Sequence, residues 1–197
     1  DISITIPEGL NVWEIDARLR SGGMTWRLGA FAQGALAYEG QLFPETYRLS
    51  PDATVEEVID IMRQEGARRM EGYSQQDVII ASLLEKEAKT LSDMKLVAGI
   101  IVKRMEIGML LQLDASVAYG WCRRVTAPGR LCDVTRAPLI SEIPKDGPYN
   151  VYARPGLPVG PIGNPGPSAL EAATHPTASD YLYYLSTRDG SRIIFSK

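Results

Sequence analysis

Hydrophobic and polar residues alternate at the start of the chain with the two-residue period of a β-strand. Ile4 and Ile6 have polar neighbours, and residues 7–9 (Pro-Glu-Gly) then interrupt the pattern with a turn signal. Apolar residues next recur at the spacing of one helix face, at Val12, Ile15 and Leu19. The pattern therefore predicts a strand, a turn and a helix over residues 3–21, a unit too small to fold by itself.

Two further helices are predicted from capping-box spacings. Thr54 precedes Glu57 by three residues and an apolar stripe follows, which predicts a helix over residues 54–70. Ser74 and Asp77 have the same spacing and introduce the segment VIIASLLEKEAKT. At about 100° per residue its apolar side chains cover nearly the whole circumference, so we expect this helix to lie buried in the middle of a domain.

The remaining chain alternates between helical and irregular patterns. A broad apolar face predicts a helix over residues 95–107, ending at Gly108. Residues 144–167 hold seven of the thirteen prolines, but their interleaved aromatic and aliphatic residues predict an ordered loop rather than a linker. A capping box of Ser168 and Glu171 predicts a short helix that ends at His175.

The segments YLYYLS and RIIFS predict a C-terminal β-hairpin, with its turn at Asp189-Gly190. Together these elements predict an α+β fold. It has a mainly helical core with short strands and a hairpin, and a small N-terminal βα lobe.

Composition narrows the class of protein. The 197 residues suffice for one compact domain, and the net charge of −3 with scattered basic residues argues against nucleic-acid binding. No run of about 18 apolar residues is present, so no spanning helix is expected within this chain. Cys122 and Cys132 lack neighbouring histidines and do not resemble a zinc site; they form either a loop-closing disulfide or two buried thiols.

Two carboxylates in the buried helix are the first candidates for chemistry. Burial raises the pKa of a glutamate towards the range in which it donates a proton near neutral pH. Glu85 and Glu87 project roughly 160° apart, so only one of them can face a given cleft. Small residues beside Glu85 favour it for a substrate site. The alternative is that both are ordinary helix charges, paired with Lys86, Lys89 or Arg104.

Four blocks in order resemble the YceG-like (MltG) family of lytic transglycosylases. They are YEGQLFPETY (38–47), IIASLLEKEA (79–88), RMEIGMLLQLDASVAYG (104–120) and GPYNVYARPGLPVGPIGNPG (147–166). The opening ITIPEGLNVWEIDARL resembles the end of the small LysM-like lobe that precedes the family's catalytic domain. The resemblance spans nearly the whole chain. It implies a partial LysM-like lobe over residues 1–37 and a YceG-like catalytic domain over residues 38–197.

The resemblance implies endolytic cleavage between N-acetylmuramic acid and N-acetylglucosamine in nascent peptidoglycan, leaving 1,6-anhydro ends and terminating strand elongation. The first glutamate of the family's E-K-E motif is catalytic and falls on Glu85, with Glu87 as the fallback. The C6 hydroxyl of the sugar is the nucleophile, so one carboxylate suffices. Neither a metal nor another cofactor is required. We expect Glu85 to abut a groove wide enough for a glycan strand.

The same blocks imply the substrate-binding residues. In the second half of the chain the family motifs L-Q-x-D-x-T-V-x-Y and S-P-Y-N-T-Y supply most of them, although Ser116 replaces the usual threonine and Gly147 the usual serine. Several have structural alternatives: a turn acid for Glu39, a helix cap for Asp114 and a turn before proline for Asn164. The full set is Glu39, Gln112, Asp114, Ser116, Tyr149, Asn150 and Asn164.

The resemblance also implies a setting. A single inner-membrane helix is expected to precede this chain in the longer protein, which would place the domain in the periplasm, with glycan strands and peptidoglycan synthases as partners. Two other functions compete: a peptidoglycan-binding module without activity, and aminodeoxychorismate lyase, an older family label. The second needs a pyridoxal-phosphate site, which the surroundings of Lys86 and Lys89 do not resemble. His175, the one histidine, is interpreted as structural.

Overall fold

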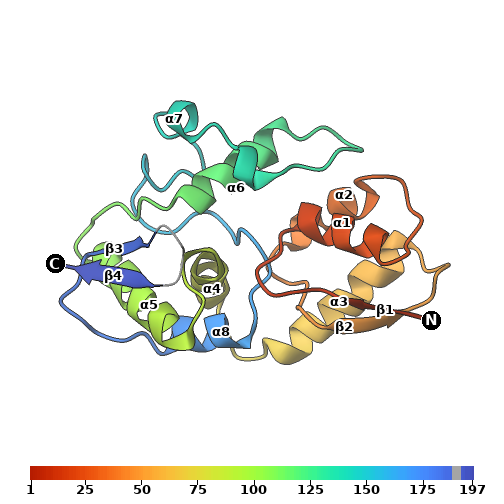
Figure 1. The fold of residues 1–197 in the computed structure, drawn as a ribbon, viewed down its shortest axis with the longest axis horizontal. Helices are drawn as coiled ribbons and strands as arrows, with labels where there is room; N and C mark the ends of the chain where they lie inside the picture. The colour runs from red at the N-terminus through yellow and green to blue at the C-terminus, as the bar shows by residue number, and fades with distance from the viewer. Residues whose placement is uncertain (188–191) are drawn as a thin grey trace.

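In the computed structural model, which describes residues 1–187 and 192–197, helices form most of the regular secondary structure and short antiparallel strands complete it (Figure 1). The predicted α+β class is confirmed. Elements from the N-terminal third lie on one side of the molecule, and the helices around α4 with the C-terminal hairpin lie on the other (Figure 1). The two chain ends are at opposite extremes of this arrangement.

The N-terminal side begins with the predicted strand and helix. Strand β1 (Ile2–Thr5) pairs antiparallel with β2 (Thr46–Leu49), with Ile2 opposite Leu49. Helix α1 (Val12–Ser21) starts at Asn11, whose side chain caps it in a box with Glu14. Helix α2 (Ala30–Ala35) and the 3₁₀ turn η1 (Leu36–Tyr38) follow, and α2 packs on α1. Strand β1 pairs with β2, which lies beyond residue 37, so the secondary structure does not mark a domain boundary at residue 37. The LysM-like lobe stays a prediction.

Both capping-box helices form as the sequence predicts. Helix α3 (Val55–Arg69) is capped by Thr54 and Glu57, and α4 (Gln75–Glu87) by Ser74 and Asp77. Helix α5 (Leu91–Glu106) begins four residues before the predicted start, because Thr90 accepts a hydrogen bond from the backbone N–H of Asp93 and caps the added turn.

Helix α4 lies in the middle of its side of the molecule, as its all-round apolar pattern predicts. It packs on α5 and on α8 (Pro167–Thr174), and six consecutive residues, 79–84, are buried. The predicted cap of α8 is wrong: Gly166 is the N-cap, Pro167 occupies the first turn, and no side chain caps the helix. Glu171 instead forms an ion pair with Lys95 of α5.

The third part of the fold is α6 (Asp114–Val125), the 3₁₀ turn η2 (Val134–Arg136) and α7 (Leu139–Glu142), which lie along one edge (Figure 1). Cys122 and Cys132 form a disulfide that ties α6 to the segment after it, which decides between the two alternatives left by the sequence.

The proline-rich loop is ordered, as predicted, and runs from α7 back to α8. The predicted hairpin forms from β3 (Tyr183–Ser186) and β4 (Ile193–Ser196), which pair antiparallel. Its predicted turn at Asp189-Gly190 lies outside the described residues. None of the described helices is long and apolar enough to cross a membrane.

Candidate active site

Glu85 lies in the last turn of α4 and is half-buried. Its Oε1 accepts a hydrogen bond from the backbone N–H of Gly166 at 2.8 Å. Burial raises the pKa of Glu85, the Gly166 N–H lowers it, and the nearby charges of Glu8 and Lys86 respectively raise and lower it. The side chain therefore combines a raised pKa with partial access to solvent, as a general acid requires.

Glu87 faces a different part of the molecule. Its Oε2 accepts a hydrogen bond from the Tyr184 hydroxyl at 3.0 Å. Burial is the main cause of its raised pKa, and the charge of Asp114 raises that pKa further. The partners of Glu85 and Glu87 come from different segments, so the two carboxylates serve separate surroundings, consistent with their opposite projection from the helix.

Glu39 is a buried carboxylate at the junction of three segments. Its Oε2 accepts hydrogen bonds from the Val12 N–H at 3.1 Å and the Tyr119 hydroxyl at 2.9 Å, and its Oε1 accepts one from the Asn164 amide at 2.7 Å. Burial nevertheless dominates and raises the pKa of Glu39 to about 7. Glu39 is thus a carboxyl group that three hydrogen bonds hold in place and that titrates near neutral pH.

Asn164 uses both ends of its side chain inside the protein. Its Oδ1 accepts hydrogen bonds from the N–H groups of Gly40 and Leu42, each at 2.9 Å, and its Nδ2 donates to the Leu10 carbonyl and to Glu39. The side chain is 1% exposed. In this conformation Asn164 positions the segment that contacts Glu85, and its predicted contact with substrate remains a prediction.

The three candidates before and within α6 have unlike surroundings. Gln112 is exposed and has a positive φ of 55°, and its N–H donates to the Val151 carbonyl. Asp114 is exposed, opens α6 without capping it, and accepts a hydrogen bond from the Tyr152 hydroxyl at 2.6 Å. Ser116 is fully buried and donates to the Tyr149 carbonyl at 2.7 Å, so it anchors the proline-rich loop on α6.

Tyr149 and Asn150 belong to that loop. The Tyr149 ring packs edge-on against Tyr119, with ring centroids 5.0 Å apart. The Asn150 amide donates to the carbonyls of Ile143 and Lys145, and its oxygen accepts from the Tyr152 N–H. Asn150 therefore folds the loop, whereas Tyr149 reaches the wall of a pocket.

A pocket of about 780 Å³ lies where η1, α3 and α4 meet the proline-rich loop. Glu39 and Tyr149 line it, together with Arg63 and Arg123. A neighbouring pocket of about 440 Å³ shares Arg123 and Tyr149 and extends along α6 to Asn150. Glu85 lines neither of them, so these two pockets do not support the expectation that Glu85 abuts a groove.

Val78 also lines the larger pocket and lies two turns before Glu85 on nearly the same face of α4, roughly 10 Å away along the axis. Residues 160–166 run along this face between them: Pro161 is beside Val78, the Ile162 N–H donates to Ser82, and Gly166 binds Glu85. The pocket and Glu85 are therefore placed at the two ends of one short segment.

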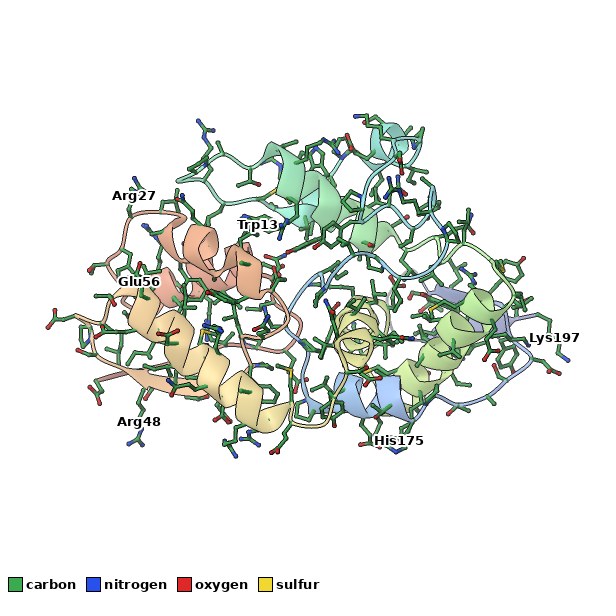
Figure 2. All side chains as sticks on the ribbon, turned by 180° about the vertical axis from the view of Figure 1, so that it is seen from behind. Trp13, Arg27, Arg48, Glu56, His175 and Lys197 are labelled. Carbon is green, nitrogen blue, oxygen red and sulfur yellow. A yellow bond between two sulfur atoms is a disulfide. The ribbon has the colours of Figure 1, made fainter. Side chains whose placement is uncertain are left out.

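Other chemistry finds little support among the described residues. No group of three or more His, Cys, Asp or Glu side chains there is placed to hold a metal ion. His175 is exposed at the end of α8, on the margin of the molecule (Figure 2). Lys86 lies 3.5 Å from the Glu14 carboxylate, with which it forms an ion pair.

Comparison with known proteins identifies the family. The model of the YceG-like family matches residues 1–197. The chain belongs to the YceG-like family.

Two YceG-like relatives are named endolytic murein transglycosylase. The protein from Bacillus subtilis (strain 168) is 35% identical over 170 residues, which cover 81% of this chain and 44% of that protein. The one from Streptococcus pneumoniae (serotype 2, strain D39) is 31% identical over 170 residues, which cover 80% of this chain and 30% of that protein. The chain thus spans less than half the length of these curated relatives.

A solved structure of a yceG-like protein from Listeria monocytogenes has the same fold. Its TM-score is 0.78 at 26% identity, and the match covers 100% of this chain and 73% of that chain. Within this YceG-like fold the predicted residues fall into two groups. Glu85, Asn164 and Glu39 meet around residues 164–166, and Glu87 and Asp114 lie on the other side of α4.

Proposed function

We propose that this chain is the catalytic part of an endolytic lytic transglycosylase that cuts peptidoglycan glycan strands, with Glu85 as its acid and base. The observation that carries the proposal is the state of Glu85: half-buried, with a raised pKa, in a chain that belongs to the YceG-like family. Relatives named endolytic murein transglycosylase support the substrate class.

The reaction balances with a single carboxyl group. Protonated Glu85 gives its proton to the glycosidic oxygen between C1 of N-acetylmuramic acid and C4 of N-acetylglucosamine, and the C1–O bond breaks. The C6 hydroxyl of the same muramic acid then bonds to C1, and its proton passes to Glu85. The products are a 1,6-anhydro end and a free C4 hydroxyl, and no water is consumed.

One carboxylate suffices because the nucleophile belongs to the substrate. A glycoside hydrolase commonly uses a second carboxylate as nucleophile or to activate water. Here the attack is intramolecular, so correct positioning replaces that group and lowers the barrier. Glu87 is not needed as a second catalytic carboxylate, and its hydrogen bond to Tyr184 fits a separate role.

The setting we propose is outside the cytoplasmic membrane, in a longer protein anchored by one membrane helix, with peptidoglycan synthases as partners. The Cys122–Cys132 disulfide supports an oxidising compartment, because such bonds persist mainly in secreted and periplasmic proteins.

The test is digestion of purified sacculi and of uncrosslinked glycan strands in H₂¹⁸O, followed by mass spectrometry. We expect anhydro-muropeptides without ¹⁸O. Glu85→Gln should lower their rate of release by about 10²-fold or more, the usual contribution of a general acid. Glu87→Gln is the matched control on the same helix and should retain most of the activity.

The result would exclude the competing functions. Hydrolysed ends that carry ¹⁸O, or equal turnover by Glu85→Gln and the wild type, would contradict the proposed chemistry. Binding of strands by the wild type with no turnover would instead identify a binding module.

A further inference from the structure

We infer that Glu8 is a second functional carboxylate of the Glu85 site: two glycines let it lie beside Glu85, where it influences proton transfer by that residue. Glu8 is a positioning residue in this role, since it acts through Glu85. Its effect on turnover rests on the function proposed above, whereas the coupling of the two carboxylates does not.

The backbone fixes where Glu8 lies. The Gly9 N–H donates to the Asn164 carbonyl at 2.8 Å, and the Asn164 N–H donates to the Leu10 carbonyl at 2.9 Å. These reciprocal bonds hold the segment before α1 against the segment before α8. Glu8 and Gly166 are therefore brought together by a small ladder between parts of the chain that are far apart in sequence.

Gly166 is the point at which both carboxylates meet. Its N–H binds Glu85 Oε1, and a Cβ added to it would lie 2.1 Å from Cδ and 2.2 Å from Oε1 of Glu8. Its φ of −90° is open to every residue, so the backbone does not demand glycine here. The space does: glycine lets the Glu8 carboxylate pack directly over the amino acid that binds Glu85.

Gly9 closes the site from the other side. Its φ is +76°, a left-handed conformation that favours glycine. A Cβ there would lie 3.0 Å from Cβ and 3.3 Å from Oε2 of Glu85. Two glycines, one from each segment, thus allow a close approach that puts a charged residue next to a half-buried acid.

The other charges around Glu85 are few. Lys86, on α4 itself, lowers its pKa but lies 3.5 Å from the Glu14 carboxylate of α1, which offsets its charge. Residues 164–166 carry no charged side chain, and the charged residue of α8, Glu171, is paired with Lys95. Glu8 is exposed and forms no ion pair with any residue that the structure describes, so no cation of the described protein neutralises its charge beside Glu85.

The decisive measurement is the pKa of Glu85 in the folded chain. It is obtained from the pH dependence of the ¹³Cδ chemical shift of this residue. Glu8→Gln should increase the acid dissociation constant of Glu85 by about threefold or more, because a nearby negative charge is lost. Glu8→Asp keeps the charge and should stay closer to the wild type.

Gly166→Ala offers an independent route to the same result. Its methyl group would displace the end of the flexible Glu8 side chain and leave the backbone N–H on Glu85. It should therefore shift the titration in the same direction as Glu8→Gln. Glu171→Gln, which removes an acid that does not face Glu85, is the control and should leave the titration unchanged.

The activity profile gives the second readout. Loss of the proton from Glu85 ends turnover at high pH, so this limb should move to lower pH in Glu8→Gln and Gly166→Ala but not in Glu171→Gln. An unchanged Glu85 titration in both Glu8→Gln and Gly166→Ala would overturn the inference. A shifted titration without anhydro products would leave the coupling intact and reject the proposed function alone.

Discussion

At the scale of single residues, three buried or half-buried glutamates are held in three different ways. Glu85 has one backbone donor and a neighbouring acid, Glu87 has a tyrosine hydroxyl, and Glu39 has three donors. Burial is the largest influence on the pKa of each and raises it. What distinguishes Glu39 is that its bonds join α1, α6 and the segment before α8, so its titration is coupled to the folded state.

Glu39 should make the protein less stable as the pH rises. Its pKa is raised from 4.5 to about 7 in the folded chain, so the folded state binds the proton more tightly than the unfolded state. The stabilisation is present below about pH 4.5 and is lost as the pH rises towards about 7. Between pH 5 and pH 8 the loss should be about 2–3 kcal/mol.

Chemical denaturation of the wild type and Glu39→Gln at pH 5 and pH 8 measures this effect. Glutamine costs some stability at both pH values, because its amide meets a hydrogen-bond donor, but it does not titrate. The difference between the two proteins should therefore change with pH by about 2–3 kcal/mol. A parallel pH dependence in both would mean that Glu39 does not titrate in this range.

At the scale of elements, local signals predicted the helices that carry their own caps. Thr54 and Ser74 begin α3 and α4 as their capping boxes predict, and Glu85 and Glu87 diverge as the helix requires. Helices without a side-chain cap were harder to predict. The N-cap of α2 is Gly29, in a left-handed conformation, and that of α6 is Leu113, so neither helix begins with a side-chain cap that the sequence could reveal.

Contacts between distant segments were beyond local reasoning. The pairing of β1 with β2 joins residues more than 40 positions apart. The sequence of Ile2–Thr5 predicts a strand but does not indicate which other strand it pairs with. The role of Glu8 was missed for the same reason, since Pro7-Glu8-Gly9 predicts only a turn. A glycine at position 166, where the predicted helix start did not need one, was the available signal.

The disulfide is the element-scale feature with the clearest energetic consequence. It closes a loop between Cys122 and Cys132, ten positions apart, and the loss of loop entropy in the unfolded chain should stabilise the fold by about 2–3 kcal/mol. Reduction, or Cys132→Ser, should therefore lower the Tm by about 5–10 °C. Calorimetry with and without reductant checks this, and Cys122→Ser/Cys132→Ser should be insensitive to reductant.

At the scale of the whole molecule, one short segment connects the N-terminal side to the helices around α4. Through Asn164 it binds Gly40, Leu42, Glu39 and Leu10, and through Gly166 it binds Glu85. The position of the acid therefore depends on bonds made to residues from the first quarter of the chain. Loss of the Asn164 hydrogen bonds should therefore alter the position and the titration of Glu85, although Glu85 lies on helix α4.

Asn164→Ala tests this dependence. It leaves the N–H groups of Gly40 and Leu42 without their acceptor and removes one donor each from the Leu10 carbonyl and the Glu39 carboxylate, and should cost about 3–5 kcal/mol of stability. Hydrogen exchange at Gly40 and Leu42 should quicken, and the Glu85 titration should change because the segment that positions Gly166 loosens.

Asn150→Ala is the matched control, because Asn150 also uses its whole side chain but bonds within residues 142–152. Asn150→Ala should lower the free energy of unfolding. Once that lower global stability is taken into account, hydrogen exchange at Gly40 and Leu42 should be as slow as in the wild type. If both variants accelerated exchange at these two sites equally, Asn164 would be one stabilising residue among others. Selective exchange in Asn164→Ala would instead establish that the N-terminal side and Glu85 are joined through this side chain.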